Sequence, residues 1–154
     1  MSVEIDLSGQ KLLVVGGSSG IGRSTAIAAA QVGADITVVG RSAEKLQEVV
    51  TTAGKGTGIA ADIRDPERCS GVVAEAVDAM GGLDALVFST AVSPLAPLDE
   101  VTADTWQDVI TTNAIAPALV AQAALDHIPE NGPIIFLSSI TVGGGHHGLA
   151  SYGA

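Results

Sequence analysis

Short apolar segments alternate along the chain with longer stretches of mixed polarity. Runs of β-branched and aliphatic residues predict strands over 11–15, 34–39, 56–61, 83–88 and 133–139. The stretches between them predict helices over 21–32, 43–52, 66–80 and 102–127. Ser42 is placed to cap the second helix, and Pro66 suits the first turn of the third. The last stretch is long enough for two helices, and we expect Pro117 to bend it.

This alternation predicts an α/β fold, a doubly wound parallel sheet of the Rossmann-like type, because parallel strands need helical crossovers. Right-handed crossovers would place helices on both faces of the sheet. We expect residues 1–154 to form a single domain whose sheet is incomplete at its C-terminal end. Ligands of such sheets bind at the carboxyl ends of the strands, where we look for chemistry.

The first strand-to-helix turn carries three glycines in the order Gly-x-x-x-Gly-x-Gly. Gly16 permits a tight exit from the strand, Gly20 lets backbone N–H groups approach a pyrophosphate, and Gly22 lets the helix pack closely. The helix N-terminus adds partial positive charge for the phosphates. The alternative is an ordinary glycine turn. The predicted phosphate-binding residues are Gly16, Ser18, Ser19, Gly20, Ile21 and Gly22.

The ends of the second and third strands suggest how the adenosine half of a cofactor is recognised. NAD sites usually place an acid after the second strand, whereas this chain has Gly40 followed by Arg41. A guanidinium there favours a 2′-phosphate, so we expect NADP(H) to be preferred, with NAD(H) possible. The alternative for Arg41 is a surface position at a helix start. Asp62 can accept a hydrogen bond from the adenine amino group, or Asp62 or Asp65 can cap the next helix.

Four motifs in the same order resemble the short-chain dehydrogenase/reductase family. The motifs are GGSSGIG from Gly16, Asp62-Ile63, Asn113 in the long helix, and Ser138-Ser139 followed by Ser151-Tyr152-Gly153-Ala154. The resemblance implies hydride transfer between a nicotinamide cofactor and a small alcohol, ketone or aldehyde. It assigns Tyr152 as acid/base, Ser139 as the group that orients the substrate oxygen, and Asn113 as the holder of a water chain. Ser139 is preferred to Ser138 because Tyr152 follows it by thirteen residues.

The chemistry implied by the resemblance is sound, but each residue also has a simpler alternative. A free tyrosine has a pKa of about 10 and is a poor base near neutrality, so a neighbouring cation is needed. Ser139 can instead bond to the backbone at a strand end. Asn113 can be a polar group on a helix face, and Tyr152, the only tyrosine, can be a packing residue.

The chain departs from the family pattern at three places. The family lysine would fall at position 156, whereas the sequence ends at Ala154, so we expect a longer enzyme and little turnover by these residues alone. Val15 stands where the family has threonine. Where the family has Asn-Asn-Ala-Gly, the chain has Phe88-Ser89-Thr90-Ala91. Ser89 and Thr90 are small enough to let the adenine ribose approach.

Composition limits the partners. The net charge is −10, and residues 1–68 hold all seven Lys and Arg, so we expect neither nucleic acid nor membrane as a partner. Cys69 is the only cysteine, and the N-terminus does not look like a signal peptide, so a cytoplasmic protein is expected. No metal is expected, because His146 and His147 are adjacent and diverge, and no spaced ligand set accompanies them. The resemblance implies a homodimer or homotetramer.

Two hypotheses of different classes follow. The first is an NADP(H)-dependent oxidoreductase that interconverts an alcohol and a carbonyl compound. The second is a nucleotide-binding module without turnover, such as a pseudoenzyme, a sensor or a truncated subunit. A nucleoside-sugar epimerase fits the glycine spacing less well.

Overall fold

A computed structural model describes residues 5–144 and 146–153 and contains one five-stranded parallel sheet. The strands are β1 (Lys11–Val15), β2 (Asp35–Gly40), β3 (Thr57–Ala60), β4 (Ala85–Phe88) and β5 (Ile134–Phe136). Their order in the sheet is β3-β2-β1-β4-β5, with the chain reversing its direction of travel after β3. The predicted doubly wound Rossmann-like sheet is therefore confirmed.

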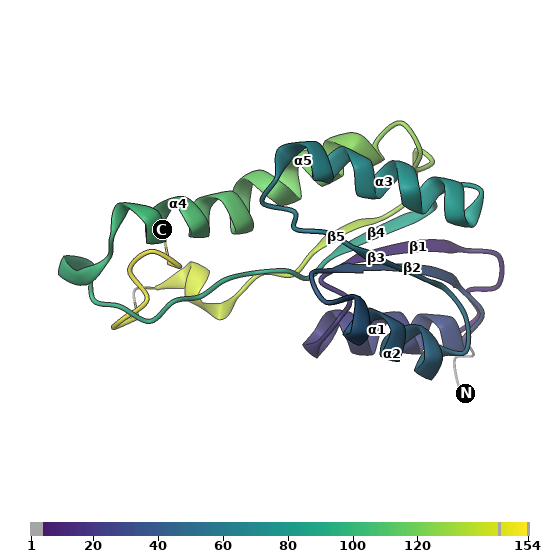
Figure 1. Ribbon diagram of the computed structural model, residues 1–154, viewed down its shortest axis with the longest axis horizontal. Helices are drawn as coiled ribbons and strands as arrows, with labels where there is room; N and C mark the ends of the chain where they lie inside the picture. The colour runs from purple at the N-terminus through teal and green to yellow at the C-terminus, as the bar shows by residue number, and fades with distance from the viewer. Residues whose placement is uncertain (1–4, 145, 154) are drawn as a thin grey trace.

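Helices cover both faces of this sheet (Figure 1). They are α1 (Gly20–Gln31), α2 (Ala43–Ala53), α3 (Pro66–Met80), α4 (Ala103–Ile110) and α5 (Ala116–Ala124). Alternate residues of β1 point to opposite layers: Leu13 joins the core beneath α3 and α5, whereas Val14 joins the core beneath α1 and α2. Packing in these two apolar layers holds the sheet, and with it the carboxyl edge, in place.

Capping residues begin the helices where the sequence predicts. The Ser42 hydroxyl accepts a hydrogen bond from the Lys45 backbone N–H at the start of α2. The Asp65 carboxylate accepts one from the Glu67 N–H at 3.0 Å, and Pro66 occupies the first turn of α3. Asp65, rather than Asp62, is therefore the cap of α3.

The predicted long helix is two helices joined by a π-helical turn. This turn covers Thr111–Ile115, and the Ala116 N–H bonds back to the Thr111 carbonyl, five residues earlier. Pro117 stands in the first turn of α5, where its missing N–H is tolerated best. The stretch contains two α-helices, as its length allowed, and the extra residue of the π turn is a feature that periodicity did not indicate.

Strand ends differ from the prediction, which extended the last strand to Ser139. β5 stops at Phe136 because β4, its partner, ends at Phe88; the last ladder bond runs from the Leu137 N–H to the Phe88 carbonyl. The following loop forms a short 3-10 turn over Ile140–Gly143. Because the strand is shorter than predicted, Ser138 and Ser139 lie outside it, at the carboxyl edge of the sheet.

Part of the chain extends beyond the sheet (Figure 1). It contains α4, the segment after β4 and the C-terminal residues that follow β5. A parallel bridge joins Ala96 to Leu149, and the Ala96 N–H donates to the Gly148 carbonyl at 2.8 Å. These bonds tie the residues before Tyr152 to the loop that leaves β4.

Candidate active site

A groove of about 420 Å³ crosses the carboxyl edge of the sheet at the ends of β1, β2 and β3. Every predicted cofactor residue except Gly22 lines it: Gly16, Ser18, Ser19, Gly20, Ile21, Arg41, Asp62, Ile63, Ser89 and Thr90. The sheet thus brings together side chains from four separate loops, as expected for the reversal point of a doubly wound sheet.

Gly16 and Gly22 stand at positions too closely packed for a side chain. Gly16 has φ +87°, and a Cβ there would lie 2.5 Å from the Thr90 hydroxyl oxygen. Gly22 is buried below the groove, and a Cβ there would lie 2.4 Å from the Gly16 carbonyl oxygen. Gly22 therefore acts through packing of α1 on the turn, as the sequence predicted.

The start of α1 fits a phosphate group. Its N-cap, Ser19, makes no side-chain capping bond, and the first turn of α1 contains no acidic residue. The first amides of a helix need an external acceptor, and the helix dipole favours an anionic one. Ser19 and Gly20 are exposed at the groove. This edge of the sheet is a suitable cradle for a pyrophosphate.

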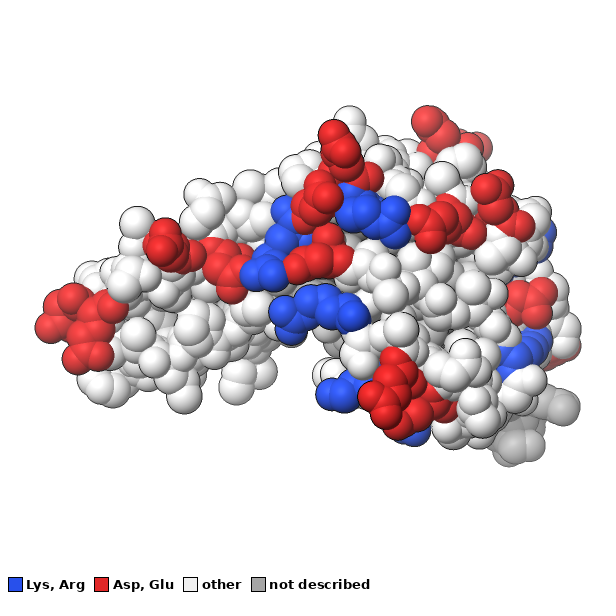
Figure 2. Space-filling model, viewed as in Figure 1, with Lys and Arg blue, Asp and Glu red and all other residues white. Residues whose placement is uncertain are grey.

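Charged side chains also line the groove beyond the ends of β2 and β3. They are Arg41 after β2, Asp62 and Arg64 after β3, and Asp108 on α4. Figure 2 shows Lys and Arg side chains gathered at the notch between the sheet and the projecting part, with acidic side chains beside them. Hydrogen bonds from Arg64 lower the pKa of Asp62, and the charge of Arg41 lowers it further. Asp62 is therefore an ionised carboxylate at neutral pH.

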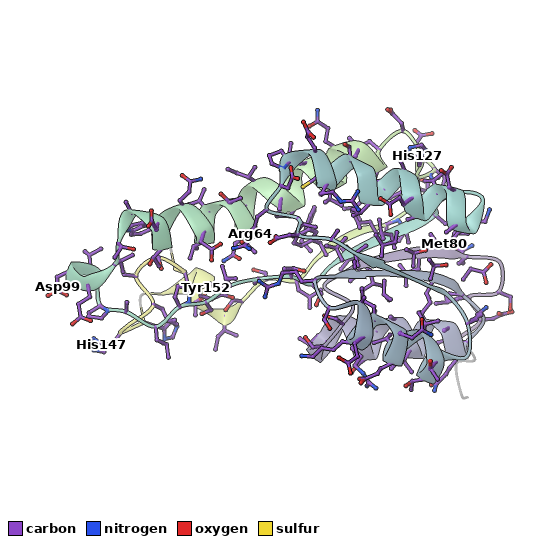
Figure 3. All side chains as sticks on the ribbon, viewed as in Figure 1. Arg64, Met80, Asp99, His127, His147 and Tyr152 are labelled. Carbon is purple, nitrogen blue, oxygen red and sulfur yellow. The ribbon has the colours of Figure 1, made fainter. Side chains whose placement is uncertain are left out.

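A second pocket adjoins the groove and contains the three predicted catalytic residues, Asn113, Ser139 and Tyr152. The two hollows share part of their lining: Thr90, Ala91, Leu137, Ser138 and Tyr152. Tyr152 is thus among the residues at which the groove and the second pocket adjoin. Figure 3 shows Tyr152 below α4, in the part of the chain that projects from the sheet.

Ser139 caps the 3-10 turn and keeps a proton to donate. Its hydroxyl oxygen accepts hydrogen bonds from the Thr141 N–H at 3.2 Å and from the Thr141 hydroxyl at 2.9 Å. Both bonds use the oxygen as acceptor, so the hydroxyl hydrogen stays available for a substrate oxygen. The backbone bonding that the sequence left as an alternative is present, and it is compatible with the orienting role.

Asn113 sits in the π turn and fastens the loop after β4. Its amide nitrogen donates to the Val92 carbonyl at 2.8 Å, and its amide oxygen accepts from the Val92 N–H at 2.9 Å. The side chain is therefore engaged with the backbone rather than standing free on a helix face. Pro117 has no N–H to give the Asn113 carbonyl the usual i+4 bond.

Replacing Asn113 by Ala is expected to destabilise the fold by about 2 kcal/mol, because it leaves both polar groups of Val92 without their partners. Denaturant unfolding of the purified protein measures this loss. Gln122→Ala is the control, because Gln122 is exposed on α5 and alanine favours helices. Equal stability of the two variants would remove the loop-fastening role of Asn113.

Several groove residues have no local signal in the sequence. Arg64 and Asp108 are 44 residues apart and meet only because α4 crosses the end of β3. Asn113 and Val92 meet in the same way across 21 residues. Arg64 directly follows Asp62-Ile63 in the sequence, so its position beside these two groove residues could have been predicted from the sequence.

Two kinds of feature are missing from the described residues. Across 5–144 and 146–153, no group of three or more His, Cys, Asp or Glu side chains is arranged to hold a metal ion. Within the same ranges, no helix has both the length and the apolar character needed to cross a membrane. Gly145, in the glycine-rich loop, lies outside the described residues.

A parallel sheet with a glycine-lined edge, a groove lined by two arginines and two aspartates, and an adjoining Ser/Tyr pocket is typical of a dinucleotide-binding α/β protein. The family model described as short chain dehydrogenase matches residues 10–154. The protein belongs to the short-chain dehydrogenase/reductase family.

Named relatives agree with this membership. A hydroxynaphthalene reductase of Aspergillus fumigatus is 35% identical over 153 residues, covering 96% of this chain and 56% of the relative. A short chain dehydrogenase from Burkholderia cenocepacia, solved in complex with NADP, is 32% identical with a TM-score of 0.92, over 97% of this chain and 63% of that one. A putative short-chain alcohol dehydrogenase from Sinorhizobium meliloti is 34% identical with a TM-score of 0.91, over 96% and 61%. The chain thus spans little more than half the length of the curated relatives that it matches.

Proposed function

We propose that the protein is an NADP(H)-dependent oxidoreductase that interconverts a small alcohol and its ketone or aldehyde. The observation that carries the proposal is the junction of the two hollows. The groove with the glycine turn and Arg41 opens directly onto the pocket with Ser139 and Tyr152. The NADP complex of the Burkholderia cenocepacia relative supports the choice of cofactor.

Different residues of this chain would bind the cofactor and act on the substrate. Backbone amides at Ser19 and Gly20 would bind the pyrophosphate, and Arg41 would bind a 2′-phosphate through charge-assisted hydrogen bonds. When bound, the nicotinamide supplies or accepts the hydride. Ser139 would donate its hydroxyl hydrogen to the substrate oxygen and fix its position. The Oη atom of Tyr152 would donate a proton to the substrate oxygen in one direction of the reaction and accept it in the other.

The Arg41→Ser variant tests the choice of cofactor. We expect the variant to bind NADPH about tenfold more weakly, because a hydrogen-bonded ion pair with phosphate is lost, while its affinity for NADH stays unchanged. Calorimetric titration with both cofactors measures the two affinities. Lys45→Ser is the control, because Lys45 is exposed on α2 and does not line the groove.

The outcomes separate the parts of the proposal. Equal affinities of the unmodified protein for NADPH and NADH would contradict the role of Arg41. Absence of binding by either cofactor would contradict the oxidoreductase proposal. Binding without turnover of any alcohol or carbonyl compound by the full-length protein would favour the second hypothesis, a nucleotide-binding module.

We also propose a homodimer or homotetramer and a cytoplasmic location. Exposed apolar side chains on the long helix support assembly: Ile115 is 41% exposed in the π turn and Leu125 is 63% exposed just after α5. A partner subunit would cover such side chains. The single, buried Cys69 is consistent with a reducing compartment.

A further inference from the structure

Arg64 bridges two structural elements at the rim of the groove. Its Nε donates to Oδ1 of Asp62 at 3.0 Å and to Oδ2 at 3.1 Å, and its Nη2 also donates to Oδ2. Its Nη1 donates to Oδ1 of Asp108 on α4 at 3.1 Å. Figure 3 shows Arg64 where the projecting part meets the sheet. The guanidinium is thereby held at one place on the groove wall by two carboxylates.

Asp62 is fully engaged by this one residue. Besides the side-chain bonds, the Arg64 backbone N–H donates to Oδ1 of Asp62 at 3.1 Å. Each carboxylate oxygen accepts two contacts, but three N–H donors of Arg64 make them, because the single Nε hydrogen is shared between both oxygens. The negative charge of Asp62 is compensated at very short range.

That compensation matters because Asp62 and Arg41 line the same end of the groove. Arg41 is close enough for its charge to act on Asp62. A 2′-phosphate held by Arg41 would therefore lie within range of the carboxylate of Asp62, and two anions at such range repel each other. Without Arg64, the negative charge of Asp62 would weaken the attraction between Arg41 and a phosphate.

We propose that Arg64 is a second determinant of preference for a 2′-phosphorylated adenosine, acting by neutralising Asp62 beside Arg41. The inference rests on the proposed cofactor. Arg64 is a positioning and charge-compensating residue, whereas Arg41 is the direct ligand of the phosphate. The bridge to Asp108 keeps the guanidinium on Asp62 instead of letting it turn into solvent.

Two adenosine fragments, 5′-AMP and 2′,5′-ADP, test this role in the full-length protein by calorimetric titration. They differ by one phosphate, so the ratio of their affinities isolates the preference. We expect Arg64→Met to weaken 2′,5′-ADP binding about fivefold and 5′-AMP binding less than twofold at about 0.1 M ionic strength. Arg68→Met is the matched control. It makes the same change in an arginine that pairs with Glu75 on α3 and does not line the groove.

The double variant Asp62→Asn/Arg64→Met gives the second test. Because the double variant removes one positive and one negative charge together, the net charge near Arg41 is unchanged, and the double variant should keep the affinity ratio of the unmodified protein. An equal loss of both ligands in Arg64→Met would indicate a merely structural role and overturn the proposal, as would an unchanged ratio. Failure of the unmodified protein to bind either fragment would instead refute the proposed function itself.

Discussion

Replacing Tyr152 by Phe is expected to lower the turnover of an alcohol or carbonyl substrate by the full-length protein about 10³-fold. The variant removes only the phenolic oxygen of Tyr152, a residue that lines both the groove and the Ser139 pocket. Proton transfer by a positioned side chain contributes about 10² to 10⁴ in rate, and no other titratable side chain lines that pocket among the described residues. Rates of NADPH oxidation with a panel of ketones and aldehydes measure the effect.

The adenosine end of the groove provides the internal control for this variant. Because Tyr152 also lines the second pocket and Arg41 does not, the affinity for 2′,5′-ADP should not change, and thermal unfolding should show that the variant folds. Full activity of Tyr152→Phe would exclude the tyrosine from the chemistry. It would leave Ser139 as a capping residue of its 3-10 turn and return Tyr152 to a packing role.

Replacing Gly22 by Ala has the second large effect, and it acts on stability and binding together. The added Cβ would lie 2.4 Å from the Gly16 carbonyl oxygen and 2.9 Å from the Gly16 carbonyl carbon, which is backbone that cannot rotate away. We expect a loss of about 3 kcal/mol in the free energy of unfolding, as for an overpacked core. NADPH affinity should fall more than tenfold, because α1 can no longer rest on the turn that it shares with the phosphate site.

Gly71→Ala is the matched comparison, because it makes the same change in another helix. The Cβ at Gly71 would meet only the far end of the flexible Arg68 side chain, at 3.1 Å. Alanine inside a helix is favoured over glycine by about 0.5–1 kcal/mol, so this variant should be stabilised. Chemical denaturation of both variants gives the comparison, and equal midpoints would show that Gly22 is not a packing position.

The parts of the fold that the sequence predicted are those with local causes. Gly16 and Gly22 lie in one turn between a strand and a helix, so their spacing alone indicated a phosphate site. The cap at Ser42 and the start of α3 at Pro66 depend on bonds within one helical turn. Alternating strands and helices then fixed the parallel sheet, and with it the edge at which the site lies.

The remaining features depend on contacts between distant parts of the chain. The end of β5 was predicted too far along, because it is set by the end of β4 rather than by the residues after Phe136. The bonds between Asn113 and Val92, and between Arg64 and Asp108, join segments whose separation in sequence carries no periodic signal. Among the site residues, these are the ones whose partners only the three-dimensional arrangement reveals.

The π turn at Thr111–Ile115 also sets the rotational phase between α4 and α5. Each residue of an α-helix turns the chain by about 100°, so one residue removed from this turn would rotate α5 relative to α4 by that angle. Val120 and Ala124, now buried against the sheet, would swing toward water, while Asn113 would lose its alignment with Val92. We therefore expect this pair of helices to tolerate substitutions better than the deletion of a residue. Engineering here can exchange residues but cannot delete one.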